Sequence, residues 1–192
     1  IFSASSGLST ELAHRNLRQL CDFSQRIFIG KCISATESFA PGSGLPAHTE
    51  YTFQVIQSIK GNVGSAITFR QFGLRSPRQI SEDLAYVGRI PGIPIYEEGK
   101  EYALFLIGDS RLGLTSPVGL FQGAFLVIED AHGNRMLANG INNVGLFKEL
   151  SADKMKLRAG LSPAEKALFA ATKGPISYEV FNALVKKIVH EN

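Results

Sequence analysis

The sequence of 192 residues has few cysteines, only Cys21 and Cys32. Their separation of eleven residues does not match the spacing of zinc-binding cysteines. The sequence also shows no pairing of either thiol with a histidine, which a thiolate nucleophile would need. A chain of this length can bury a sizeable core without metals or disulfides. Two alternatives stay open: one disulfide, which favours an oxidising compartment, or two buried thiols.

Long apolar runs and a strong charge imbalance are also missing. The longest apolar run, Tyr102 to Ile107, is far shorter than the roughly 20 residues that cross a bilayer, so no transmembrane segment is predicted. The net charge is +3, and residues 1–150 carry 13 basic and 13 acidic side chains. Residues 151–192, with seven basic and four acidic side chains, supply the excess. Nucleic-acid surfaces need clustered positive charge, so nucleic acid is not an expected partner.

No catalytic, cofactor-binding or metal-binding signature is present. The histidines are scattered without metal-ligand spacing: His14, His48, His132 and His190. Only His48 and Glu50 could share one face of a strand, which supplies two metal ligands at most. The glycines in residues 42–47 precede a predicted strand, whereas a dinucleotide-binding loop must precede a helix. The sequence therefore predicts no catalytic residue, no metal ligand and no cofactor.

The pattern of apolar residues predicts a mainly β fold. Alternating or continuous apolar runs predict about six strands joined by short turns, with no helix between them. These strands cover Arg26–Ser38, Thr49–Lys60, Ile67–Gly73, Lys100–Ile107, Val118–Glu129 and Arg135–Ala138. That order excludes parallel βαβ units and favours an antiparallel closed barrel or sandwich. Gly30, inside the first strand, indicates a kink of the kind that bends strands into barrels.

Helices are predicted at both ends of the chain. The first covers Ser9 to Leu20. The second begins at Ser162, where Pro163 and Glu165 complete a capping box, and ends before Gly174. The third covers Ile176 to His190. We therefore expect a β-barrel domain with an N-terminal helix over residues 1–150, and a helical appendage packed on the barrel over residues 151–192.

Residues Leu74 to Gly99 form the longest irregular segment. Prolines 77, 91 and 94 argue against a central strand here, and such a long loop is either functional or mobile. Three arginines in it are the candidate binding residues: Arg75, Arg78 and Arg89. Their guanidinium groups could bind a carboxylate or a phosphate. Alternatively, they could pair locally with the neighbouring acids Glu82 and Asp83.

The strand sequences resemble those of bacterial exported proteins with a netrin/TIMP-like barrel, which belongs to the OB-fold type. The resemblance covers residues 21–108 and rests on IFIGKCISATES, YTFQVIQSIKG, ITFRQFG and EEGKEYALFL. It implies an OB-like barrel and an exported protein, periplasmic or secreted. TIMP-type inhibitors engage a metalloproteinase through an amino-terminal cysteine, whereas this chain begins with Ile1. No functional residue is therefore carried over.

Three functions are compatible with these observations. The absence of a catalytic constellation favours a non-enzymatic structural or protein-binding module, with another protein as its partner. OB-type barrels often bind oligosaccharides or oligonucleotides, which is the first alternative and requires exposed aromatic side chains. The second alternative is a hydrolase with its site in residues 74–99, which requires the acids of that segment to meet His48 or His132 in a cleft.

Overall fold

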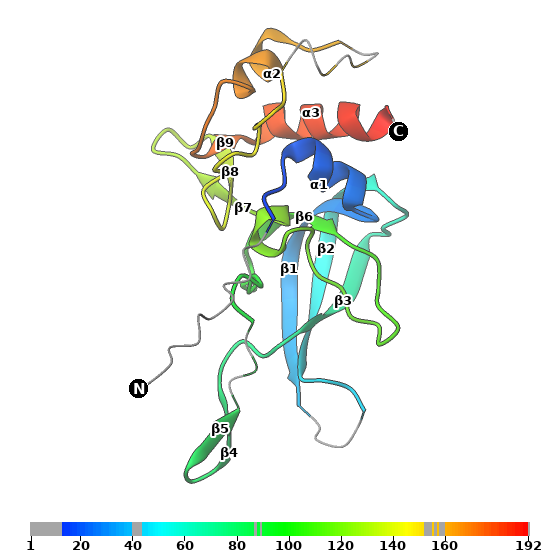
Figure 1. Ribbon diagram of the computed structural model, residues 1–192, viewed down its shortest axis with the longest axis vertical. Helices are drawn as coiled ribbons and strands as arrows, with labels where there is room; N and C mark the ends of the chain where they lie inside the picture. Colours follow the sequence, from blue (N-terminus) through cyan, green and yellow to red (C-terminus); the bar gives the residue numbers. More distant parts are fainter. Residues whose placement is uncertain are drawn as a thin grey trace, which may run out of the picture.

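The computed structural model describes residues 13–39, 44–86, 88, 90–151, 155, 157 and 160–191. It confirms a mainly β fold with a seven-stranded antiparallel sheet and three α-helices within these residues (Figure 1). The sheet contains β1 (Arg26–Ser38), β2 (His48–Lys60), β3 (Ala66–Phe72), β6 (Glu101–Leu106), β7 (Ala124–Glu129), β8 (Arg135–Asn139) and β9 (Ile176–Ser177). Its strand order is β3-β2-β1-β6-β7-β8-β9. No helix in the described residues is long and apolar enough to cross a membrane.

The predicted strands are present, with one correction and one addition. The predicted strand Val118–Glu129 is wrong in its first half, which forms the 3₁₀-helix η1 (Leu120–Gly123) before β7 begins. Leu120 there has a φ of 55°, which no strand residue adopts. The irregular segment after Leu74 contains an additional hairpin, β4 (Arg78–Ser81) paired with β5 (Leu84–Tyr86), which does not join the large sheet.

Strand β1 lies between β2 and β6 in the sheet and is bent as Gly30 predicted. Its register against β2 shifts three times, once directly before Gly30. A Cβ atom at Gly30 would lie 2.8 Å from the backbone oxygen of Gln54, closer than real Cβ contacts. The glycine therefore allows the two backbones to approach at this kink.

The seven strands do not close into a barrel, because the end strands β3 and β9 do not pair with each other in the described part of the chain. The segment between β6 and η1 nevertheless bridges β3 and β6. Thr115 N donates a hydrogen bond to Arg70 O of β3, and Arg70 forms a parallel bridge with Leu114. On its other side, Ile107 N donates to Ser116 O, and Val118 N donates to Phe105 O of β6.

The sheet separates two apolar clusters. One, here called the aromatic cluster, consists of Phe28, Cys32, Tyr51, Phe53, Val63, Phe69, Tyr96, Tyr102, Leu104, Leu106 and Ala124. The other lies between the sheet and the helices and includes Cys21, Ile27, Phe105, Phe125 and Phe181. Alternate residues of β1 face the two clusters, so Ile27 packs under the helices while Phe28 packs in the aromatic cluster.

The two cysteines are free and lie in different clusters, which decides between the two alternatives left open by the sequence. Burial raises the pKa of the Cys21 thiol to about 12, and the nearby carboxylate of Asp22 adds to this effect. Burial also raises the pKa of Cys32, with Glu98 as the second cause. Both thiols are therefore protonated at neutral pH and pack as apolar side chains.

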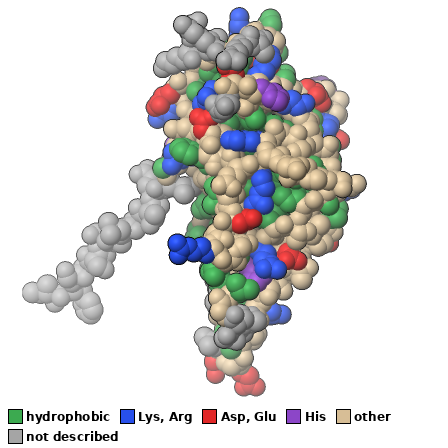
Figure 2. All heavy atoms as spheres, turned by 90° about the vertical axis from the view of Figure 1, so that its right-hand side faces the viewer, with side chains coloured by type: hydrophobic (Ala, Val, Ile, Leu, Met, Phe, Trp, Pro, Cys, Tyr) green, Lys and Arg blue, Asp and Glu red, His purple; other side chains and the backbone are tan. Residues whose placement is uncertain are grey.

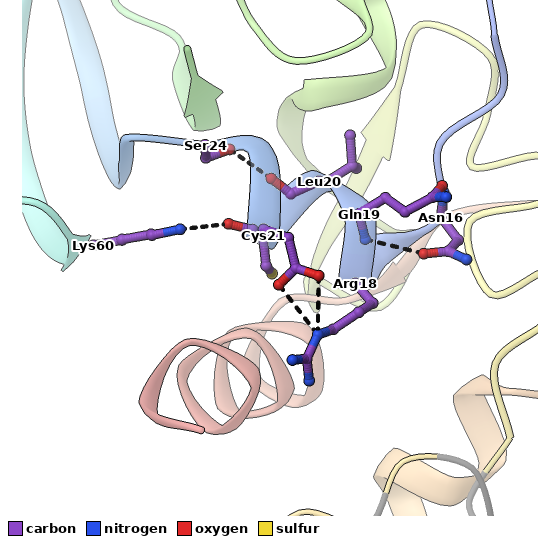
Figure 3. A network of polar contacts seen from close by, with 8 residues as sticks. Asn16, Arg18, Gln19, Leu20, Cys21, Ser24 and Lys60 are labelled. Atoms are coloured by element: carbon purple, nitrogen blue, oxygen red, sulfur yellow. Dashed lines mark hydrogen bonds and ion pairs between the residues drawn. The ribbon is translucent and has the colours of Figure 1, made fainter. Parts of the chain in front are cut away.

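The N-terminal helix is present but lies later in the chain than predicted. Helix α1 covers Leu17–Phe23, the four described residues before it are not helical, and residues 9–12 lie outside the described part. Asn16 accepts a hydrogen bond from Gln19 N at 3.0 Å and caps the helix (Figure 3). Upstream, Arg15 N and Ala13 O are bonded to the side chain of Gln122. These bonds hold residues 13–15 outside the helix.

Of the two C-terminal helices, α3 packs on the sheet beside α1, and α2 packs against α3 (Figure 1). Helix α2 (Pro163–Leu168) begins at the predicted cap Ser162, with the predicted capping box, but ends earlier than the predicted stop at Gly174. Helix α3 (Tyr178–His190) begins two residues later than predicted, because Ile176 and Ser177 pair with β8 as β9. The boundary between a barrel domain and a helical appendage at residue 150 stays a prediction.

Candidate functional site

A surface groove of about 630 Å³ lies beside the second half of β1. It is lined by Ala35, Thr36, Glu37, Arg75, Ser76 and Ile95. The pairing of β1 with β6 ends at Lys31, and one further pair of backbone bonds joins Cys32 to residues 99 and 100. Beyond that point, among the described residues, β1 pairs only with β2. The groove therefore opens where β1 has lost its second neighbouring strand.

Two carboxylates attach the ends of the 74–99 segment to β1. Glu37 Oε1 accepts hydrogen bonds from the backbone N–H groups of Arg75 and Ser76, the second at 3.1 Å. At the other end of the segment, Glu98 Oε1 accepts from the backbone N–H of Ala35 at 3.1 Å. Because both carboxylates are bonded to backbone groups, their negative charge is partly compensated.

Of the predicted candidates that the structure describes, Arg75 lines this groove and Arg78 does not. Arg75 is half-buried, and within the described chain its guanidinium forms no ion pair. Burial raises the pKa of Tyr51 and of Tyr102, and the nearby Arg75 cation acts in the opposite direction on both. The Arg75 cation thus lies near Tyr51 and Tyr102 of the aromatic cluster.

The other two candidate arginines are not shown to converge with Arg75. Arg78 is exposed at the start of β4, and Arg89 lies outside the described residues. In the part of the chain that is described, neither Arg75 nor Arg78 forms an ion pair with Glu82 or Asp83. The three-arginine site therefore stays a prediction.

The β4–β5 hairpin projects from the body of the molecule (Figure 1), and it follows Arg75 and Ser76 of the groove lining in the chain. All four residues of β4 are exposed, and Ile80 keeps 53% of its surface accessible. Acidic side chains gather at this end of the molecule in Figure 2, where Glu82 and Asp83 form the turn. An isolated two-stranded hairpin is only marginally stable in water, so an arm of this kind gains stability when another surface covers it.

The remaining candidate residues do not assemble into a site. The ring nitrogen Nδ1 of His48 lies 2.9 Å from Pro46 O, while Glu50 forms an ion pair with Arg70. His132 lies in the exposed turn between β7 and β8, and the lining of the groove includes no histidine. Among the described residues, no group of three or more His, Cys, Asp or Glu side chains could hold a metal ion.

Sequence reasoning missed the residues that build the groove. Tyr96 is completely buried in the aromatic cluster and fixes the neighbouring Ile95 at the groove wall. Glu37 and Glu98 lie at the end of a strand and in a turn, where acids are ordinarily solvated. The available signal was Tyr96, an aromatic residue that lies between Pro94 and the acids Glu97 and Glu98. Such a residue indicates that the segment returns to the core.

No family model, no curated protein and no solved structure matches this chain.

Proposed function

We propose that the chain is an exported, non-enzymatic protein-binding module that holds its partner with the 74–99 segment. The observation that carries this proposal is the combination of a projecting hairpin with a groove at its base. The hairpin presents an exposed apolar side chain, Ile80, and the groove presents Arg75, a cation without an ion pair among the described residues. Binding residues are commonly found on loops that a rigid scaffold positions.

We further propose that the scaffold is an OB-like barrel of the netrin/TIMP-like type. The support is the bridging segment 114–118, which is bonded to β3 on one side and to β6 on the other. Together with the order β3-β2-β1-β6, this segment gives a circuit of five extended segments. An OB-fold is a partly open five-stranded barrel. Export is supported only by the resemblance of residues 21–108 to exported proteins.

The alternatives have less support. An oligonucleotide or oligosaccharide site of the OB type needs exposed aromatic rings, whereas Tyr51, Phe53 and Phe69 are buried. A hydrolase needs the acids of the 74–99 segment next to a histidine. Glu82 and Asp83 instead lie in the exposed hairpin turn, and His48 is buried at the start of β2.

The test is partner capture with two matched variants of the full chain. Ile80→Asp places a charge on the hairpin, and Ile56→Asp places one on β2, at a side chain that is also 53% exposed. Because both positions are exposed, each variant should stay folded, with a stability change of about 0.5 kcal/mol or less. We expect Ile80→Asp to weaken capture of the partner from the source organism by about tenfold or more, as a contact at an interface centre would.

Ile56→Asp should capture the same partner as the unmodified chain, at the same salt concentration. Quantitative mass spectrometry of the captured proteins gives the comparison. Equal capture by the Ile80 variant, or loss of capture only with the Ile56 variant, would show that the hairpin is not the binding element.

A further inference from the structure

We propose that the groove beside β1 binds an extended acidic segment of a partner protein, which adds to the sheet as a further strand next to β1. This inference rests on the proposed protein-binding function and specifies how the partner is recognised. Three features of the described residues carry it: a strand edge without a neighbouring strand, a replaceable bond on that edge, and a cation beside it that forms no ion pair.

The free edge is the second half of β1. Each residue of β1 from Arg26 to Lys31 has a partner on β6, but the strand continues for seven residues after Lys31. Cys32 is bonded to the backbone of residues 99 and 100, and within the described ranges the following residues pair with β2 on the other side only. Unpaired backbone N–H and C=O groups on a sheet edge form a template for another strand. The 630 Å³ groove is lined by Ala35, Thr36 and Glu37 of this half of β1.

Glu98 already forms one of the bonds that an added strand would form. Its Oε1 accepts a hydrogen bond from the backbone N–H of Ala35, as the carbonyl oxygen of a neighbouring strand would. Glu98 is itself exposed, so its carboxylate can return to water when a peptide carbonyl replaces it. The side chain protects the edge in the unbound protein and does not block it permanently.

Among the described lining residues, Arg75 is the cation, and it favours an acidic occupant although Glu37 also lines the groove. The carboxylates of Glu37 and Glu98 are bonded to backbone N–H groups, whereas the half-buried guanidinium of Arg75 has no carboxylate partner in the described chain. A guanidinium binds a carboxylate with two parallel hydrogen bonds, a strong and directional contact. An Asp or Glu side chain of the added strand would supply that carboxylate.

The experiment uses defined peptides and the full-length chain. The probes are blocked peptides of alternating valine and threonine with a central glutamate, glutamine or lysine, of about six residues, which span roughly 20 Å when extended. A fourth probe is the glutamate peptide with alternate backbone nitrogens methylated, which removes the edge hydrogen bonds. Backbone amide chemical shifts of the isotope-labelled chain report both the affinity and the location of binding.

We expect the glutamate peptide to shift the amides of residues 33–38 and 75–76 and to bind about tenfold more tightly than the glutamine and lysine peptides. Methylation should abolish this binding. Arg75→Gln should remove the preference for glutamate, while Arg78→Gln, a matched change on exposed β4, should leave it intact. Glu98→Ala should tighten binding a few-fold, because it removes the competing carboxylate.

Equal affinity for the three peptides, shifts confined to other residues, or no shift up to about 5 mM peptide would overturn the inference. These results are distinct from failure of the proposed function. If the peptides do not bind but Ile80→Asp still weakens partner capture, the 74–99 segment binds protein, and only the proposed strand addition is wrong. If the peptides bind as expected but partner capture does not depend on Ile80, the groove binds acidic strands, and the hairpin is not the binding element.

Discussion

Replacing Tyr96 with alanine is expected to lower the free energy of unfolding by about 3–5 kcal/mol, the range for truncating a large buried aromatic. Tyr96 has no accessible surface. Its ring packs edge-on against Tyr51, Tyr102 and Phe53 at centroid distances of 4.8, 5.2 and 5.4 Å. The substitution leaves a cavity in the aromatic cluster, and the segment that carries Ile95 and Glu98 loses its attachment to the core.

The measurement is urea unfolding of the unmodified chain and of two variants. Tyr96→Phe is the control, because it keeps the ring and removes only the hydroxyl, whose hydrogen bond to Gln71 is long at 3.4 Å. We expect a loss of about 1 kcal/mol or less for this control. A loss of less than about 1 kcal/mol for Tyr96→Ala would show that the 74–99 segment is not anchored through this residue.

Replacing Glu165 with glutamine is expected to cost about 1–2 kcal/mol at neutral pH, below the range for a fully buried ion pair because its partner is partly exposed. Glu165 is 2% exposed, its Oε2 lies 2.7 Å from Lys187 Nζ, and it also accepts a bond from Ser162 N. This carboxylate joins the start of α2 to the end of α3. Glutamine keeps the shape but leaves the Lys187 cation without its counter-charge.

The cost of Glu165→Gln should depend on pH. Burial alone would raise the pKa of the Glu165 carboxyl, but the hydrogen bonds from Lys187 and Ser162 outweigh it and hold the pKa below the ordinary 4.5. The carboxylate therefore stabilises the fold fully above pH 4.5, and this contribution is lost as the pH falls through the lower folded pKa.

Unfolding free energies of the unmodified chain and of Glu165→Gln, measured from neutral to acid pH, should thus converge at low pH. Glu179→Gln is the control, because Glu179 is exposed in the first turn of α3. It should cost about 0.5 kcal/mol or less at every pH. A difference for Glu165→Gln that stays constant down to acid pH would contradict the role given to its charge.

The sequence was a good guide where one local signal determines the structure. Alternating apolar residues predicted β2, and Ser162, Pro163 and Glu165 predicted the start of α2, because period and capping are local properties. The N-terminal helix was placed too early because the bonds of residues 13–15 go to Gln122, more than a hundred residues away. Propensity cannot report such a partner.

The candidate site was only partly predictable for the same reason. Arg75 was predicted as a binding residue because it is an arginine in a long irregular segment, which the sequence shows directly. Its position beside the edge of β1, however, depends on where β6 stops pairing with β1. Glu37 and Glu98 meet backbone groups 38 and 63 residues away in the chain. These contacts form only in the folded chain, so the groove itself left no pattern in the sequence.

The most direct test of the account is residue-resolved hydrogen exchange of the chain alone and with its captured partner. If the 74–99 segment and the adjoining edge of β1 bind the partner, the amides of residues 33–38 and 78–81 should exchange more slowly in the complex. Amides of α2 and α3 should be unchanged. Protection confined to the C-terminal helices, with residues 33–38 and 78–81 unaffected, would contradict the proposal.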